Sequence, residues 1–308
     1  MQIRHILAGL CCLAALSQPA FAKVLEVGEG KAYSKLAEAA GAAQPGDTIH
    51  ISDGEYFDCG VFRRDNLIIE GSSEAGTVLT DKACEGKALL VLGGSGITVR
   101  NLTLTRARVP DGNGAGIRAE GGDLLIDHVK FVNNQNGILS ADGTAKITVR
   151  DSEFDRNGVC DQYCSHGIYA GHIALLRVEH SVFRETKQGH HIKSRAMRTE
   201  VINCDLADGQ NGTSSYVVDV PNGGGVLVSG NTMQKGPLSE NHGAFVIVGE
   251  EGITQRTPEI IVENNTATVD GGYPSFLLNN GTATEAVVRG NKLHGGSLKA
   301  LKGDGSVK

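Results

Sequence analysis

The chain has 308 residues, a formal net charge of −6, 42 glycines and no tryptophan. The acidic balance argues against a general nucleic-acid binder, whose binding domain is basic, so we expect no nucleic-acid partner. Glycines between many short Val/Ile runs favour an all-β chain with many turns.

The first 22 residues have the features of an export signal. A short basic start, "MQIRH", precedes the apolar run "ILAGLCCLAAL", and "SQPAFA" ends in a small-x-small cleavage site after Ala22. The apolar run is shorter than the roughly 20 residues that span a bilayer, and no later stretch is apolar enough to do so. We therefore predict a signal peptide over 1–22, no membrane span and a secreted or periplasmic protein.

Five of the seven cysteines remain after removal of this segment. An oxidising compartment permits disulfides, and we predict Cys160–Cys164, within "CDQYC", and Cys59–Cys84. Cys204 is then left as a buried thiol. A metal site at "CDQYC" is the alternative, but no second cysteine pair stands at zinc spacing, so we predict no metal.

A single amphipathic helix is expected near the start of the mature chain. "SKLAEAAGAAQ" (34–44) opens with Ser34, a good N-cap residue. The apolar side chains of Leu36, Ala39, Ala40 and Ala43 share one face. This helix would cover the first strands of the fold, whose exposed edge otherwise invites aggregation.

An internal repeat follows. Segments such as "ITVRNLTL", "LLIDHVKF" and "ITVRDSEF" alternate apolar and polar residues around a polar or glycine turn, at intervals of 23 to 34 residues and about 27 on average. The turn positions are Gly71, Asn101, His128, Asp151, His180, Asn203, Gly230, Asn264 and Gly290. A second set of short strands, such as "GIRAEG" and "GIYAG", lies between them.

A unit this small can bury its apolar side only by stacking on its neighbours. The repeat therefore predicts a right-handed parallel β-helix of about nine rungs over 23–296, capped by the N-terminal helix, with a polar tail over 297–308. A β-propeller is the alternative, but its blades run to roughly 40–50 residues. The helix, the "PGDTIHISDGEY" entry and the stacked units resemble the β-helix superfamily of pectate lyases and related polysaccharide enzymes, which includes lyases, hydrolases, epimerases and non-catalytic members.

The second set of strands places a mixed group of side chains on one face. Because side chains alternate along a strand, we expect one inward column, made of Ile117, Ile138, Ile168, Ile192, Val218, Val246 and Leu277. The next residues should face solvent, namely Arg118, Leu139, Tyr169, Lys193, Asp219, Ile247 and Leu278. The stretch "RETKQGHHIKSRAMR" (184–198) adds histidines and arginines on the middle rungs. The alternative is structural: Lys193 and Asp219 would then form an ordinary surface ion pair.

This group favours β-elimination over hydrolysis, because hydrolysis usually needs two carboxylates and the face offers little beyond Asp219. Elimination needs a cation that neutralises the substrate's carboxylate, a base and an acid. The candidate catalytic residues are Lys193, Tyr169, His191 and Arg195. The candidate substrate-binding residues are Arg118, His166, His190, Arg198 and Asp219. Lys193 could be the base if neighbouring cations lower its pKa, and Tyr169 is the alternative base or acid.

"HIKSRAMRTEVINCDL" is similar to the lysine-bearing strand of β-helix alginate lyases and chondroitinase B-like enzymes, and that match implies that Lys193 is the base. Those enzymes carry an arginine one rung on, where this chain has Asp219, and the paired Asp and His of the epimerases are absent. We predict a lyase acting on an acidic, uronate-containing polysaccharide. The alternatives are a non-catalytic glycan-binding or surface-assembly protein and a uronate C5-epimerase. No cofactor is expected: calcium is possible, but "DGNG" at Asp111 and "DGQNG" at Asp208 are more simply turns. The oligomeric state stays open.

Overall fold

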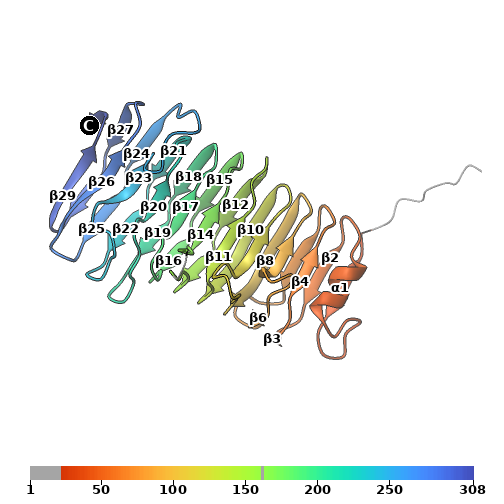
Figure 1. Ribbon diagram of the computed structural model, residues 1–308. Helices are drawn as coiled ribbons and strands as arrows, with labels where there is room; N and C mark the ends of the chain where they lie inside the picture. The colour runs from red at the N-terminus through yellow and green to blue at the C-terminus, as the bar shows by residue number, and fades with distance from the viewer. Residues whose placement is uncertain (1–21, 161–162) are drawn as a thin grey trace, which may run out of the picture.

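A computed structural model describes residues 22–160 and 163–308, and the predicted signal peptide over 1–22 lies almost wholly outside them. The chain winds into an elongated rod of stacked parallel strands, with one helix at the N-terminal end and the C-terminus at the other (Figure 1). In the described part of the chain, no helix has the length and apolarity to cross a membrane. The predicted parallel β-helix is confirmed.

Two parallel sheets make the walls of the rod. One has ten strands, which follow one another in space in chain order: β4 (Gly60–Phe62), β7 (Ala88–Leu92), β9 (Ala115–Ala119), β11 (Asn136–Ser140), β14 (Ile168–Ala170), β17 (Ile192–Ser194), β20 (Val218–Val220), β23 (Ala244–Val248), β26 (Pro274–Asn280) and β29 (Ser297–Lys302).

The other sheet has twenty strands and covers the remaining faces. Its members are β1 (Val24–Val27), β2 (Thr48–Ile51), β3 (Gly54–Tyr56), β5 (Ile68–Gly71), β6 (Thr77–Thr80), β8 (Ile97–Thr105), β10 (Leu124–Val132), β12 (Lys146–Arg150), β13 (Glu153–Asp155), β15 (Leu175–Glu179), β16 (Val182–Arg184), β18 (Arg198–Ile202), β19 (Asp205–Ala207), β21 (Gly225–Ser229), β22 (Thr232–Lys235), β24 (Ile260–Glu263), β25 (Thr266–Val269), β27 (Ala286–Arg289), β28 (Lys292–His294) and β30 (Gly305–Val307).

The corners between successive faces occur at the predicted turn positions. Eight of the nine adopt a positive φ, between 49° at Asp151 and 71° at Gly230; Gly71 is the exception. Asparagine and glycine adopt this left-handed conformation most easily. The same local conformation at these eight positions lets the chain turn at one edge of the rod on successive rungs.

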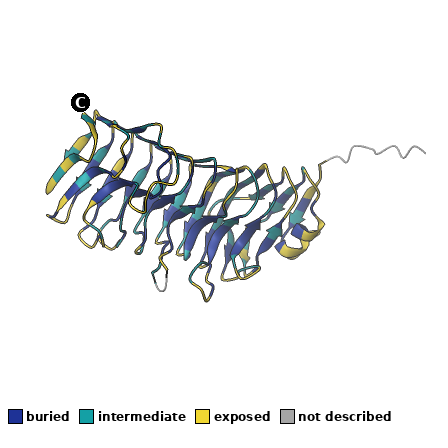
Figure 2. Cartoon of the chain, turned by 45° about the horizontal axis from the view of Figure 1, so that its top comes forward, coloured by how far each residue is buried: buried dark blue, intermediate teal, exposed yellow. Residues whose placement is uncertain are grey.

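Side chains of one kind stack inside the rod. Phe131, Phe154 and Phe183 form a column with ring centroids 4.6 and 4.4 Å apart. Asn231 donates from its amide to Asn265 Oδ1 at 2.9 Å, and this contact repeats on the next rung. The buried strands of Figure 2 run without interruption along the rod. The core is thus one continuous stack, as a solenoid requires.

Both ends of the rod differ from the sequence prediction. Residues 297–308 form β29 and β30, which pair with β26 and β27, so the ten-stranded sheet exceeds the nine predicted rungs. The polarity of this segment reflects its place as the last, outward rung, where only one side meets the core. The helix α1 spans Leu36–Ala42, with Lys35 rather than Ser34 at the N-cap and no side-chain capping bond.

The predicted apolar face of α1 is buried, and Asp58 supplies what the N-cap does not. The Asp58 carboxylate accepts from the amide N–H of Ala37 at 3.3 Å. A carboxylate from a later rung therefore satisfies part of the helix N-terminus.

Candidate functional site

The ten-stranded sheet carries a column of outward side chains along its middle. The register pairs Ile138 with Ile168, Ile168 with Ile192, and Ile192 with Val218, so the residues that follow them are also aligned. The outward column therefore runs Arg118, Leu139, Tyr169, Lys193, Asp219, Ile247 and Asn279. On the last of these rungs the prediction was wrong by one residue, because Leu278 rather than Leu277 pairs with Val246.

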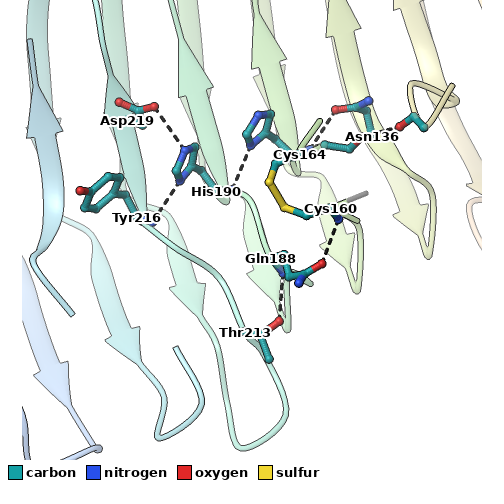
Figure 3. Close-up of a disulfide and its surroundings, with 11 residues drawn as sticks. Asn136, Cys160, Cys164, Gln188, His190, Thr213, Tyr216 and Asp219 are labelled. Carbon is teal, nitrogen blue, oxygen red and sulfur yellow. Dashed lines mark hydrogen bonds and ion pairs between the residues drawn. A yellow bond between two sulfur atoms is a disulfide. The ribbon is translucent and has the colours of Figure 1, made fainter. Parts of the chain in front are cut away.

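A second column lies three residues earlier in the chain, just before each strand begins, and is aromatic on three successive rungs: His166, His190 and Tyr216. The rings of His166 and His190 stack with centroids 4.9 Å apart, and those of His190 and Tyr216 with centroids 5.4 Å apart. Figure 3 shows His190 in contact with both Tyr216 and Asp219. These rings form one wall beside the column that contains Lys193.

Both wall histidines are neutral and hold a fixed tautomer. His166 Nδ1 accepts from the His190 N–H, and His190 Nδ1 accepts from the Tyr216 N–H, each at 3.0 Å. The proton of each neutral ring is therefore on Nε2. Burial, with Lys193 and Arg195 nearby, lowers the pKa of His166 to about 3, and burial likewise lowers the pKa of His190 well below its usual value. The two rings offer N–H donors, not bases.

Lys193 lies between two carboxylates. Its Nζ is 3.1 Å from Asp219 Oδ2 and 2.6 Å from Glu251 Oε1. Burial alone would lower the pKa of Lys193, but the two carboxylates outweigh it and raise that pKa above its usual value. The condition under which Lys193 could be the base, a lowered pKa, is therefore not met, and in this arrangement the ammonium cannot act as the base.

The pKa values of Asp219 and Glu251 shift in opposite directions, although both carboxyls contact Lys193. It is 2% exposed, and burial raises the pKa of its carboxyl to about 6 even though Lys193 opposes that shift. Burial tends to raise the pKa of Glu251 as well, but hydrogen bonds from Lys193 and Arg195 prevail and lower it. The partly exposed Glu251 is thus held ionised, while Asp219 titrates nearer neutrality.

Arg195 joins the two columns to the loop that follows β23. Its Nε donates to the Tyr169 hydroxyl oxygen at 2.9 Å, its Nη2 donates to Glu251 at 2.6 Å, and it also binds the amide oxygen of Asn222. A guanidinium that donates to a hydroxyl oxygen stabilises negative charge developing there during proton transfer. Tyr169 is therefore the outward group best placed to exchange a proton.

Three hollows of about 410–420 Å³ follow this face and share lining residues. The middle hollow is lined by His166, Tyr169, His190, Lys193 and Arg195, together with Asn113, Tyr163 and Cys164. The hollow on the N-terminal side includes Arg118 and Tyr169, and the one on the C-terminal side includes His190 and Glu240. We call this continuous depression the groove.

Two predicted site residues lie elsewhere. His191 points into the rod and is completely buried, with Nδ1 2.6 Å from Thr186 Oγ1 and Nε2 3.2 Å from Asp208 Oδ1. Arg198 begins β18 on another face, where it contacts Glu200 and Glu259 at 2.5 Å. Neither side chain reaches the groove, so the structure excludes both from direct contact with a ligand bound there.

The position of His191 has a geometric cause. It aligns with Gly116, Gly137 and Gly167, where an added Cβ would meet the interior phenylalanine rings at 2.8 to 3.4 Å. The strands bend here, so two consecutive residues face inward and simple alternation fails. Asp208, interpreted as a turn residue, is the buried partner of His191, and that histidine, with Nε2 3.2 Å from Oδ1, lowers the pKa of the carboxyl despite its burial.

Residues that the sequence reasoning missed come from the loops beyond the strands. Glu251 and Asn222 contact the groove's cations, and the Tyr216 hydroxyl donates to Glu250 at 2.9 Å. One signal was available: the interval from Gly230 to Asn264 is the longest in the repeat. That interval contains the loop carrying Glu250 and Glu251.

The structure contains Cys160–Cys164 and Cys59–Cys84 as disulfides, and Cys204 is a buried free thiol. The first disulfide lies at the edge of the groove, where the Cys160 N–H donates to Gln188 (Figure 3). The candidate metal cluster among the described residues is Asp127, His128 and Asp151. Arg150 already pairs with Asp127 at 2.6 Å, and the cluster lies on another sheet from the groove.

The comparisons with known proteins agree with the architecture. A family model described as "Right handed beta helix region" matches residues 45–206. No curated protein sequence matches.

Among solved structures, an alginate lyase from Paenibacillus sp. str. FPU-7 aligns with a TM-score of 0.56 at 16% identity, over 90% of this chain and 99% of its own. The catalytic unit of an α-1,3-glucanase from Streptomyces thermodiastaticus aligns with a TM-score of 0.56 at 14% identity, over 95% and 67%. A protein of Geobacillus virus E2 aligns with a TM-score of 0.51 at 11% identity, over 92% and 60%. Identities this low establish the shared fold, and the activities of these proteins are their own. With the family model matching more than half of its length, the chain belongs to the right-handed β-helix family.

Proposed function

We propose that this chain is an exported protein that binds an acidic polysaccharide along the groove and cleaves it by β-elimination. The observation that carries this proposal is the contact between the Tyr169 hydroxyl and Arg195 Nε at 2.9 Å, beside Lys193 and two neutral histidines. The alginate lyase with a similar fold supports the reaction class by analogy only.

In this reaction Tyr169 exchanges the proton. Tyr169 starts as the phenolate: the C5–H bond of a uronate breaks and its proton moves to the Tyr169 oxygen, the C5–H electron pair forms the C4–C5 double bond, and the C4–O bond breaks. The proton that Tyr169 has gained then passes to the leaving oxygen, which regenerates the phenolate. Arg195 stabilises charge on the Tyr169 oxygen, and together with protonated Lys193 it neutralises the uronate carboxylate. The Nε2–H group of His166 donates a hydrogen bond to the sugar, whereas His190 Nε2 lies 3.3 Å from Asp219 Oδ2 and holds that carboxyl in place. Lys193 thus binds and polarises, in place of the role as base expected from the sequence.

Hydrolysis fits the geometry less well. Glycosidases place two carboxyl groups on either side of the scissile bond. Here the two candidates are Asp219 and Glu251, and both contact the same Lys193 Nζ. At 2% exposure Asp219 lies beneath the groove surface and cannot contact a glycosidic oxygen directly.

The test is a screen of anionic polysaccharides for ultraviolet absorbance from unsaturated uronate ends. We expect at least one polymer to give this signal with the wild type, and Tyr169→Phe to abolish it while the polymer still binds. Binding without unsaturated ends in any polymer would overturn the proposed elimination. With a polymer deuterated at C5 of its uronates, loss of the deuterium without chain cleavage would instead indicate an epimerase.

A non-catalytic glycan-binding or surface-assembly role is the second candidate, and one observation favours it. Each basic residue between 184 and 198 has a carboxylate partner within the chain: Arg184 with Asp205, Lys187 with Glu185, Lys193 with Asp219 and Glu251, Arg195 with Glu251, and Arg198 with Glu200 and Glu259. This pairing leaves little free positive charge on the surface. Wild-type binding of a polysaccharide with no chemical change would support this role.

A further inference from the structure

The carboxylate of Glu251 occupies the space between the two cations of the groove. Oε1 is 2.6 Å from Lys193 Nζ, and Oε2 is 2.6 Å from Arg195 Nη2. One carboxylate thus bridges an ammonium and a guanidinium, which is the arrangement that charge-assisted recognition of a carboxylate uses. Its side chain is still 43% exposed, so the space opens to solvent.

The loop that carries Glu251 does not depend on this carboxylate for its position. Its backbone donates from Glu251 to the Pro221 carbonyl and from Thr254 and Gln255 to the Asn222 carbonyl, all at 3.1 Å. The amide of Asn222 donates back to the Gly252 carbonyl at 3.1 Å. The side chain of Glu251 can therefore rotate out of the groove while the loop stays in place.

Removing the Glu251 carboxylate would leave the groove with one negative charge too few to balance its cations. Lys193 would keep Asp219 at 3.1 Å, whereas Arg195 would keep only the neutral partners Tyr169 and Asn222. The remaining local charge is then one positive unit, which a single carboxylate balances. A ligand with one carboxylate per sugar can thus replace Glu251 without leaving a charge unpaired.

We propose that the space between Lys193 and Arg195 is the subsite for a single uronate carboxylate, and that Glu251 occupies it until the substrate displaces it. This inference rests on the proposed function, because it assigns the acidic sugar to the same groove. Tyr169, hydrogen-bonded to Arg195, adjoins the bound carboxylate. Glu251 makes binding selective, because a ligand without a carboxylate cannot replace its ion pairs.

The experiment measures binding of uronate tetrasaccharides by calorimetry, using a panel built from galacturonate, mannuronate, guluronate and glucuronate. The variants are Glu251→Gln and Glu251→Asp, the second keeping the charge on a shorter side chain. We expect Glu251→Gln to bind at least one panel member about five-fold more tightly than the wild type, since an exposed ion pair no longer competes, and Glu251→Asp to fall between the two. A neutral glucose tetrasaccharide should have the same affinity for the wild type and for both variants.

The matched control is Glu259→Gln. Glu259 is equally exposed and contacts Arg198 at 2.5 Å, but on another face of the rod, so its loss should leave binding unchanged. Weaker or unchanged binding by Glu251→Gln would overturn the inference, as would a panel that binds none of the proteins. Tighter binding by Glu251→Gln without unsaturated products would retain the subsite and reject only the elimination.

Discussion

Glu251 Oε1 lies 2.6 Å from Lys193 Nζ, although the two residues are 58 positions apart in the sequence. Lys193 is on β17, whereas Glu251 follows β23, which is two rungs further along the rod. The basic stretch that attracts attention in the sequence is therefore neutralised by the chain itself. Its cations are positioned by internal carboxylates, and a ligand must compete with these to bind them.

Replacing Lys193 by alanine should lower stability, contrary to what an ordinary exposed position on the rod would give. Its side chain is 11% exposed and that of Asp219 is 3% exposed. Removal of one partner of a buried pair leaves an uncompensated charge and costs about 3 kcal/mol. Urea unfolding at pH 7 measures this, with the exposed Lys187→Ala as the control. Adding Asp219→Asn to Lys193→Ala should recover much of the loss, and equal losses in the single and double variants would contradict the buried pair.

The inward column provides a test of the core. Ile168 is completely buried and pairs in register with Ile138 and Ile192. Ile168→Asp should prevent folding, because it buries an unpaired charge between two rungs. Ile168→Val, which removes one methylene, should cost only about 1 kcal/mol. Far-ultraviolet circular dichroism and urea titration distinguish the two outcomes, and a folded Ile168→Asp variant would contradict the assigned register.

The fold could be predicted because the same local pattern recurs on every rung. The turn residues Asn101 and Asn264 adopt a left-handed conformation, and the isoleucines before Arg118 and Tyr169 are buried. The same two local preferences therefore recur along the repeat. The one register error arose where the pattern is ambiguous. In "PSFLLNNG" two adjacent leucines are both buried in the core, and the one that pairs with Val246 is Leu278.

The site was predicted only in part, for two physical reasons. Alternation fails at the bend of each strand, so His191 faces inward although its neighbour His190 belongs to the groove wall. The loops between rungs do not repeat, so no periodicity could place Glu251 against Lys193. That contact depends on the path of one long loop, which the sequence reports only as a wide interval between turns.

The pH dependence of stability should report the environment of Asp219. Its pKa of about 6 in the folded protein exceeds the roughly 3.9 of an unfolded aspartate. A raised pKa means that this group's contribution to stability is fully present below about pH 4 and is lost as the pH rises through about 6. In Asp219→Asn this contribution is absent. The free energy of unfolding of the variant, relative to the wild type, should therefore increase by about 3 kcal/mol from pH 4 to pH 7.5. Urea titrations at several pH values measure the difference, and parallel curves for the two proteins would contradict the buried carboxyl.

The most direct test of the chemistry is Tyr169→Phe. The substitution removes one oxygen, the one that accepts from Arg195 at 2.9 Å, and keeps the ring against His166. Tyr169 exchanges the proton in the transition state and contributes little to binding of the substrate beforehand. Turnover should therefore fall by about 10²–10⁴-fold, while KM changes little. The matched control is Tyr216→Phe, whose hydroxyl binds Glu250 and not the groove's arginine. It should retain most of the turnover. A Tyr169→Phe variant with wild-type turnover would exclude Tyr169 as the proton-transfer group, and loss of binding in that variant would indicate that its hydroxyl positions Arg195 for the ligand.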